Sequence, residues 1–483
     1  MAPRDRTNAL LAAALLIVVT PAALAPIYSY DLFWHLAAGR WIAAHHALPL
    51  TDPFAIGSDR VPWINGEWLF EVPLFFVHAV GGIALVAWLR ALIVATTFAA
   101  GFFFAARRGA TGIALLLAAL AFAGGNERLD ARPGTVAALF VVLAIALLAQ
   151  RSRAATIAYV LLSIAWINTH PSALLAPAFP AAVALLARER RDAWITAAAS
   201  AAALLVNPFG VEAIAAPLRL TAFAGSGAFV NAEWVPSQPA VFPLLYVTVV
   251  IGVVAFASAR DRRDHVWRIA IFAVLAYLSI AHVRNQGLYF AAFPLLVAPI
   301  VRIERAQRAF AIAALLPIAS VAARGDHRPS LVAHRFPVAA VARLRQTKLQ
   351  GNIYNPDQFG GYLIWSFFPQ RRVLTDGRNE LYHSFLREYA VARVDSRAWH
   401  ALLRKYRIDL AVDEYRGALD VVDGRSGRHQ SIPASLAYFP RRDWALMGYD
   451  EAGMVFARRA AFTPAIVDRW ELRGIVPDAQ RSR

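Results

Sequence analysis

Apolar segments that recur between short polar connections dominate the first 324 residues and limit the fold more than any other feature. About eleven such segments lie near residues 8–27, 83–106, 111–123, 135–149, 154–168, 172–187, 194–206, 239–258, 267–282, 286–301 and 309–323. The chain is 58% hydrophobic and 17% charged, so it has more apolar surface than a soluble protein of 483 residues needs to bury. The sequence predicts a polytopic α-helical membrane protein with about 11 transmembrane helices.

Arginines gather in alternate connections between these segments. The clusters are Arg107 and Arg108; Arg151 and Arg153; Arg188, Arg190 and Arg191; Arg260, Arg262 and Arg263; and Arg302, Arg305 and Arg308. Basic residues mark cytoplasmic loops, which accounts for the formal net charge of +17 without a nucleic-acid partner. We expect a cytoplasmic amino terminus, a first segment kept as an uncleaved anchor, and carboxy-terminal residues on the outer side of the membrane.

The composition changes near residue 325 to that of a soluble domain. We therefore predict a transmembrane domain over 1–324, which includes a first outer loop at 29–71, and an outer α/β domain over 325–483. Within the second domain we expect strands near 351–356, 371–378, 408–413 and 447–457, and helices near 359–367, 382–394 and 397–406. The chain has no cysteine, so this domain is built without disulfides or thiolate metal ligands.

The first outer loop is the part of the membrane domain richest in ionisable groups. Five acids, three histidines and four tryptophans lie between residues 31 and 71. Tryptophans suit the headgroup layer, so we expect the loop to lie along the membrane surface. The apolar stretch 68–80 that follows is too short to cross a membrane, and we expect it to dip in or lie flat.

Motifs along nearly the whole chain resemble those of the GT-C superfamily. The residues concerned are Asp31-Leu-Phe-Trp-His35, Gly39-Arg40, Asp52-Pro53-Phe54, Glu67-Trp68-Leu69, Arg132-Pro133, Asn168 with His170, Asn207-Pro-Phe-Gly210, Glu233-Trp234, Arg284-Asn285, Asn355-Pro356, Gly360-Gly-Tyr-Leu363 and Asp376-Gly377-Arg378. GT-C proteins are integral-membrane glycosyltransferases that use a polyprenyl-phosphate sugar, and they include protein O-mannosyltransferases, aminoarabinose transferases and oligosaccharyltransferases. The chain resembles an uncharacterised bacterial branch of this superfamily more closely than those members.

The resemblance implies an inverting glycosyltransferase in the bacterial inner membrane, with a periplasmic carboxy-terminal domain. Its partners would be a polyprenyl-phosphate-linked sugar, membrane lipids and an acceptor of unknown kind, with no nucleic acid. Asp31 matches the superfamily Asp that orients or deprotonates the acceptor. Such a reaction needs a base and donors for the departing phosphate. The catalytic candidates are Asp31, Asp52, Glu67 and His35, and the substrate-binding candidates are Arg128, Arg132, His170, Arg284, Asn285 and Glu233.

No cofactor is expected, and a divalent metal is disfavoured. Asp31 is followed by Leu32, whereas well-studied members often carry a second acid there, and a hard cation needs several oxygen ligands.

Plainer interpretations of the same residues stay open. Asp31 could cap a helix, Arg132-Pro133 could begin one, and Arg284 could extend toward the membrane surface. Asp376-Gly377-Arg378 is more typical of a turn than of a site. The alternative function is a non-catalytic membrane scaffold of the same fold, or a protein that binds lipid-linked glycans. A transporter is disfavoured because the polar groups gather at one face.

Overall fold

The computed structural model of the chain describes residues 3–150, 152–187, 191–225, 233–303, 305–422 and 428–478. The chain forms two compact units, each built from two pieces of sequence. Unit 1 consists of Met1–Ile27 and Ile64–Ser330, and unit 2 consists of Tyr28–Trp63 and Leu331–Arg483. Arg151, Arg188 and Arg190, which belong to the expected basic connections, lie outside the described residues.

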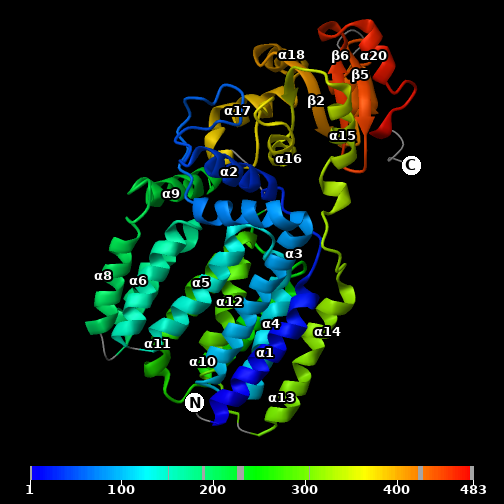
Figure 1. The fold of residues 1–483 in the computed structure, drawn as a ribbon. Coiled ribbons are helices and arrows are strands. Elements are labelled where there is room, and N and C mark those ends of the chain that lie inside the picture. The colour runs from blue at the N-terminus through cyan, green and yellow to red at the C-terminus, as the bar shows by residue number, and fades with distance from the viewer. Residues whose placement is uncertain are drawn as a thin grey trace. The chain divides into compact units, whose positions relative to one another are not determined.

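Unit 1 is helical throughout its described residues (Figure 1). Its helices are α1 (Pro3–Ala23), α3 (Trp68–Ala106), α4 (Thr111–Gly125), η1 (Asn126–Arg128), α5 (Pro133–Leu148), α6 (Arg153–Ile167), η2 (Pro171–Leu174), α7 (Leu175–Leu186), α8 (Arg191–Ala203), α9 (Glu212–Gly225), α10 (Pro243–Ala257), α11 (Arg262–Ala281), η3 (Val283–Asn285), α12 (Gln286–Val297), α13 (Gln307–Ala313) and α14 (Leu315–Arg324). Helices α3, α4, α5 and α12 pack against one another, and α12 is buried along its length.

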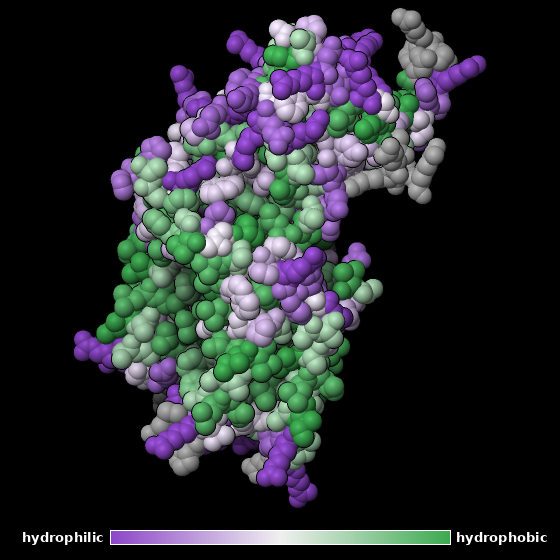
Figure 2. Space-filling model, turned by 45° about the vertical axis from the view of Figure 1, so that its right-hand side comes forward, coloured by the Kyte–Doolittle hydropathy of each residue, from purple (hydrophilic) through white to green (hydrophobic). Residues whose placement is uncertain are grey.

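The outer surface of unit 1 is apolar, as a lipid-facing surface must be. Large side chains such as Leu10, Val80 and Leu161 are 73%, 83% and 62% exposed. Figure 2 shows this hydrophobic surface over the helices, with hydrophilic side chains toward the lower edge of the view. Burial against other helices therefore leaves a second apolar face that lipid can cover.

Among the described residues, three helices are long and apolar enough to cross a membrane. They are Arg4–Ala23, Trp68–Ala106 and Arg263–Ala281. Four shorter apolar helices lie at Pro133–Leu148, Arg153–Ile167, Pro171–Leu186 and Pro243–Ala257. Because these are shorter than the roughly 20 residues of a straight span, the predicted number of 11 crossings stays a prediction.

Helix α3 contains a break that the sequence analysis predicted between 68–80 and 83–106. Gly81 and Gly82 have non-helical backbone angles, and Gly82 has φ 59°. A positive φ costs glycine little, so this pair can turn the chain between two helical segments. In Figure 1 the part of α3 before the break runs crosswise to α1 and α4.

Unit 2 combines short helices with a mixed sheet. Its main elements are α2 (Leu32–His45), η4 (Ala333–Arg335), α15 (Val338–Thr347), β1 (Asn352–Tyr354), α16 (Asp357–Phe367), η5 (Asn379–Leu381), α17 (His383–Ala392), α18 (Ser396–Lys405), β2 (Ile408–Glu414), β3 (Ala418–Val422), β4 (His429–Pro433), α19 (Ala434–Tyr438), β5 (Trp444–Tyr449), β6 (Gly453–Arg458), η6 (Arg459–Ala461) and α20 (Pro464–Trp470). The main sheet has the order β1-β2-β6-β5, with β1 parallel to β2 and the other pairs antiparallel.

Several predicted elements of unit 2 need correction. The strand expected at 371–378 is only a bridge between Ala55 and Val373, followed by an irregular segment. The single strand expected at 447–457 is the hairpin β5–β6, because the Asp450 carboxylate accepts hydrogen bonds from the backbone of Ala452 and Gly453 in the turn. The pair β3–β4 was not predicted, since both strands are short and largely exposed and β4 is mostly polar.

The first outer loop, which the prediction assigned as residues 29–71 to the transmembrane domain, is divided between the two compact units, and the predicted domain division stays a prediction. Residues Tyr28–Trp63 belong to unit 2. Trp34, Phe54 and Trp63 are 7%, 0% and 3% exposed and form part of the hydrophobic core of that unit. The interpretation of Trp34 and Trp63 as headgroup anchors is therefore wrong, because their rings are buried by protein.

Candidate functional site

Asp31 stands immediately before α2, but its side chain does not cap the helix. No capping hydrogen bond forms, and the backbone angles of Asp31 are helical. Its Oδ1 instead accepts a hydrogen bond of 3.1 Å from the indole Nε1 of Trp34. The carboxylate is thus held by a side chain one turn along α2.

Gly377 brings the segment Asp376-Gly377-Arg378 against this carboxylate. A Cβ atom on Gly377 would lie 2.7 Å from Asp31 Oδ1, so no larger residue fits without movement of the carboxylate. Gly361 in α16 lies equally close to α2, since a Cβ there would be 3.0 Å from the Tyr30 carbonyl oxygen. Two motifs from the carboxy-terminal part of the chain therefore define the surroundings of Asp31.

A buried ion-pair network lies beside this contact. Arg378 donates to Asp376 at 2.8 and 2.6 Å and to Asp52 at 2.9 Å, and all three side chains are at most 1% exposed. The Tyr382 hydroxyl lies 2.7 Å from Asp376 Oδ2 and 3.1 Å from Asp52 Oδ2. The network joins the first loop to the segment 376–382.

Contacts within the network account for the lowered pKa of Asp52. Burial raises the pKa of Asp52, but the charge of Arg378 and the hydrogen bond from the Phe54 N–H outweigh burial and hold that pKa below its usual value. The Arg378 guanidinium also lies 4.3 Å from the ring centroid of Trp63. Both oxygens of Asp52 are engaged, which is the geometry of a structural ion pair rather than of a base facing a substrate.

The other two catalytic candidates, His35 and Glu67, have different surroundings. His35 is 2% exposed, and its imidazole lies against the indole of Trp34 with ring centroids 3.6 Å apart. Glu67 belongs to unit 1, where it precedes α3 without a capping side-chain bond. The structure thus brings Asp31, Asp52 and His35 into one unit and places Glu67 in the other.

Four of the predicted substrate-binding residues meet in unit 1. Arg132 forms an ion pair with Glu233, and the two side chains are 18% and 38% exposed. The Arg284 backbone N–H donates to the Glu233 carbonyl at 3.1 Å, and its guanidinium lies 4.6 Å from the ring centroid of Trp234. Residues more than 150 positions apart in sequence therefore form one arginine cluster, here defined as Arg132, His170, Glu233 and Arg284.

His170 completes this cluster as a neutral ring. Its Nδ1 accepts from the Ser172 backbone N–H at 3.1 Å, which requires an unprotonated nitrogen. Burial, followed by the charges of Arg284 and Arg132, lowers the pKa of His170 to about 3. Burial raises the pKa of Glu233, but Arg132 and then Arg284 lower it below its usual value. An anion at this place would meet two arginines, one of them already paired with the ionised Glu233, and an uncharged imidazole.

The remaining binding candidates have more local roles. The Arg128 guanidinium lies 5.5 Å from the ring centroid of Phe242. The Asn285 side chain donates to the Leu278 backbone carbonyl at 3.1 Å. The backbone carbonyl of Asn285 accepts from Ser279 Oγ at 3.1 Å. Asn285 thus fixes the turn that carries Arg284.

Across the described ranges, no group of three or more histidine or carboxylate side chains is placed to hold a metal ion. The expectation that no divalent metal is needed stays a prediction.

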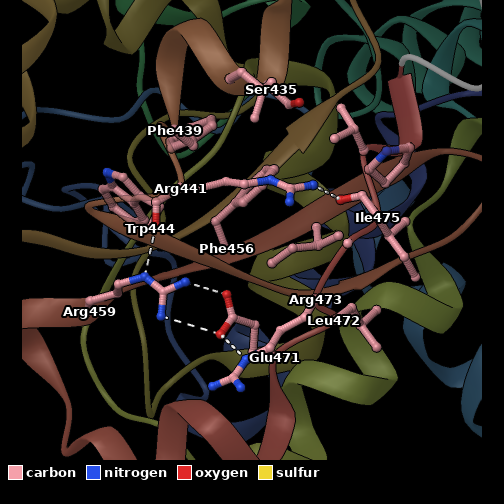
Figure 3. A pocket seen from close by; sticks show the side chains of 15 residues that line it. Ser435, Phe439, Arg441, Trp444, Phe456, Arg459, Glu471, Leu472, Arg473 and Ile475 are labelled. Atoms are coloured by element: carbon pink, nitrogen blue, oxygen red, sulfur yellow. Dashed lines mark hydrogen bonds and ion pairs between the residues drawn. The ribbon is translucent and has the colours of Figure 1, made fainter.

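A separate hollow lies at the end of the sheet in unit 2 (Figure 3). It has a volume of about 320 Å³, with Phe439, Trp444 and Phe456 among its lining residues. Arg459 and Arg473 both contact Glu471, and Arg441 donates to the Ile475 carbonyl at 2.7 Å. These three arginines thus form ion pairs or hydrogen bonds within unit 2. The sequence analysis did not name them as site candidates.

The chain shares its fold with solved membrane glycosyltransferases, so the predicted resemblance to GT-C proteins is confirmed at the level of the fold. Neither a protein-family model nor a curated protein matches the sequence.

Three of the solved proteins that share this fold illustrate the similarity. The oligosaccharyltransferase AglB of Archaeoglobus fulgidus, in complex with an inhibitory peptide and a dolichol-phosphate, superposes with a TM-score of 0.59 at 9% identity, over 88% of this chain and 74% of that one. ArnT of Cupriavidus metallidurans in the apo state superposes with a TM-score of 0.55 at 13% identity, over 94% of this chain and 99% of ArnT. Its complex with undecaprenyl phosphate superposes with a TM-score of 0.51 at 14% identity, over the same shares of the two chains. The mycobacterial arabinofuranosyltransferase AftD superposes with a TM-score of 0.55 at 15% identity, and the match covers 94% of this chain but 40% of AftD.

Proposed function

We propose that this chain is an inverting glycosyltransferase that moves a sugar from a polyprenyl-phosphate carrier to an acceptor at the outer face of a bacterial inner membrane. The acceptor is a lipid, glycan or protein. The arginine-rich connections support an orientation in which the carboxy-terminal residues are periplasmic. The fold shared with AglB, ArnT and AftD supports the reaction class.

The placement of Asp31 carries the proposal. Its carboxylate is not used as a helix cap, and the Trp34 indole fixes it against Gly377. In the proposed step the acceptor hydroxyl attacks the anomeric carbon and gives its proton to Asp31. The bond from that carbon to the phosphate oxygen breaks, and polyprenyl phosphate leaves with the electron pair. A positioned base of this kind contributes about 10²-fold or more to the rate.

The arginine cluster is proposed to bind the phosphate of the carrier. Arginine presents a planar set of donors that suits a phosphate, and charge develops on that group as the sugar departs. The cluster adjoins the start of α5, because a Cβ on Gly134 would lie 3.6 Å from His170 Nε2. The amino end of a helix favours an anion as well. AglB with dolichol-phosphate and ArnT with undecaprenyl phosphate supply the chemical class of ligand.

Asp31→Asn tests the proposal directly. Asparagine keeps the size and one acceptor for the Trp34 indole but cannot take a proton. We expect turnover to fall about 10²-fold or more, with the melting temperature near that of the wild type. The measurement compares the surface glycans and lipids of a deletion strain that carries the wild-type or the variant gene, followed by transfer assays on membranes with the donor so found.

Asp59→Asn is the matched control, because Asp59 lies in the same loop but is 60% exposed and pairs with Arg372. It should restore the wild-type glycans. A fully active Asp31→Asn protein would remove Asp31 as the base and would favour the non-catalytic scaffold.

A further inference from the structure

Two adjoining hollows lie at the end of unit 1 opposite the arginine cluster. The first has a volume of about 410 Å³ and is lined by polar residues that include Arg107, Arg108, Gln150, Ser152 and Arg268. The second has a volume of about 390 Å³ and a lining that is almost wholly apolar, with Leu143, Leu147, Leu161 and Leu162 in its wall. Phe104, Ala146 and Gln150 line both hollows, so the two adjoin each other.

The polar hollow is positively charged. The Arg107 side chain is 46% exposed, and its Nε lies 3.4 Å from Asp5, the acid that pairs with it. Arg108 is exposed and donates to the Ala149 carbonyl. Arg268 is 8% exposed, lies 4.2 Å from the Trp267 ring centroid and approaches His265 Nδ1 at 3.3 Å. An anion in the hollow would therefore meet several guanidinium groups, one of them almost buried in α11.

The apolar hollow opens on the lipid-facing side of the helices. It runs between α5 and α6, from Leu143 and Leu147 to Leu161 and Ala165. Leu161 is 62% exposed, as expected of a side chain that faces acyl chains. Residues 158 to 165 of α6 line it over about 10 Å. Its shape and composition suit a hydrocarbon chain rather than a polar ligand.

We propose that these hollows form one binding site for an anionic phospholipid, with the phosphate in the arginine-lined hollow and an acyl chain in the apolar groove between α5 and α6. Basic pockets between membrane helices are suited to anionic headgroups. The adjoining groove distinguishes a lipid from free phosphate, because only a lipid fills both hollows.

This lipid site is distinct from the site proposed for the carrier. Arg132 precedes the first residue of α5, whereas Ala146, Ala149 and Gln150 lie at or beyond its other end. The helix has 16 residues and is about 24 Å long. The lipid site therefore does not depend on the proposed glycosyltransferase function. A lipid bound only to the folded protein stabilises the packing of α3, α5, α6 and α11 by mass action.

Two variants separate the headgroup from the chain. Arg107→Gln with Arg108→Gln removes two exposed charges from the polar hollow, and Ala158→Phe fills the apolar groove. Arg305→Gln with Arg308→Gln is the matched control, because these exposed arginines give the same charge change and do not line either hollow. Purified full-length protein in a neutral detergent is titrated with phosphatidylglycerol, phosphatidylcholine or inorganic phosphate. Retained lipid is counted by native mass spectrometry, and the melting temperature is followed.

We expect phosphatidylglycerol to be retained and to raise the melting temperature of the wild type, with phosphatidylcholine at least tenfold weaker. The double Arg107/Arg108 variant and Ala158→Phe should each weaken phosphatidylglycerol binding about tenfold, since a phosphate contact or a buried chain contributes roughly 1.4 kcal/mol or more. The control should stay within twofold of the wild type. Equal binding of the two lipids, an equal loss in the control, or a melting shift from inorganic phosphate as large as that from the lipid would overturn the proposal.

Discussion

Two clusters in this protein contain the same residue types, an arginine, an acid and a tryptophan. The side chains of the two clusters are buried to very different extents. In unit 2 the Arg378 and Asp52 side chains are 1% and 0% exposed, and Tyr382 and Asp376 form further hydrogen bonds with them. In unit 1 the Arg132 and Glu233 side chains are 18% and 38% exposed. The first cluster is closed to ligands and joins two pieces of chain, whereas the second keeps surface through which an anion can reach it. Burial, rather than residue type, separates the structural cluster from the candidate binding site.

The largest effect is expected for Arg378→Ala. Removal of this guanidinium leaves Asp52 and Asp376 buried without their counter-charge, so the free energy of unfolding should fall by about 3 to 5 kcal/mol. Chemical unfolding of unit 2, followed by tryptophan fluorescence, measures the change. Tyr382→Phe gives a milder second variant, with an expected loss of about 1 kcal/mol.

Arg372→Ala is the matched control for this comparison. Arg372 also joins the carboxy-terminal segment to the first loop, through Asp59, but the side chains are 40% and 60% exposed. Its removal should cost less than about 1 kcal/mol. Equal losses for Arg378→Ala and Arg372→Ala would show that burial does not set the role of these pairs.

A smaller effect is expected for Arg284→Ala in the open cluster. If Arg284 contacts the carrier phosphate, its loss should weaken binding of undecaprenyl phosphate roughly tenfold, which corresponds to about 1.4 kcal/mol, and should leave the unfolding midpoint nearly unchanged. Titration of the purified protein with the lipid measures this. Arg219→Ala, which removes an exposed arginine paired with Glu212 in the same unit, should bind as the wild type does. Unchanged binding in Arg284→Ala would assign that arginine to its contact with Trp234 alone.

The smallest effect is expected from pH. The pKa of Asp52 is lower in the folded protein than its usual value of 3.8, so the folded state takes up its proton less readily than the unfolded state. Asp52 therefore contributes stability above pH 4, and this contribution is lost as the pH falls through the lowered pKa. Between pH 5 and pH 3 the melting temperature of the wild type should fall more steeply than that of Asp52→Asn. Parallel curves would show that Asp52 is not the group that titrates.

The local parts of the fold could be predicted from sequence. Apolar runs of a helix's length identified most helices of unit 1, and the break at Gly81 and Gly82 separated the two parts of α3. In unit 2, helices α16 and α18 and strand β2 were predicted within a few residues, because their apolar patterns and turn residues are local. The four residues of the arginine cluster were named as binding candidates because they lie in polar connections between apolar segments, and their role in binding stays a prediction.

The pairing of distant segments could not be predicted. Asp52 was named as one candidate base and Asp376-Gly377-Arg378 as a turn, but their joining in one buried network was not predicted. One sequence contains no signal that links residues so far apart. The nearest hint was the presence of two glycines at 360 and 361 and one at 377, since a residue without a side chain often marks a place where another part of the chain comes close. Trp34 and Trp63 were misplaced for the same reason, because an indole can be buried in lipid or in protein.

The division of unit 2 into two pieces of sequence has a consequence for how the protein is made. Asp52 and Arg378 are separated by 326 residues, and all of the second piece of unit 1 lies between them. At 5 to 20 residues per second, a ribosome needs about 15 to 65 seconds to make the segment between them. During that time Asp52 lacks its counter-ion Arg378, and Trp63 lacks the later residues of the core that buries it. The newborn first loop must therefore remain unaggregated while the helices of unit 1 are inserted, and Asp31 acquires its final surroundings only when the segment containing Gly377 has been synthesised.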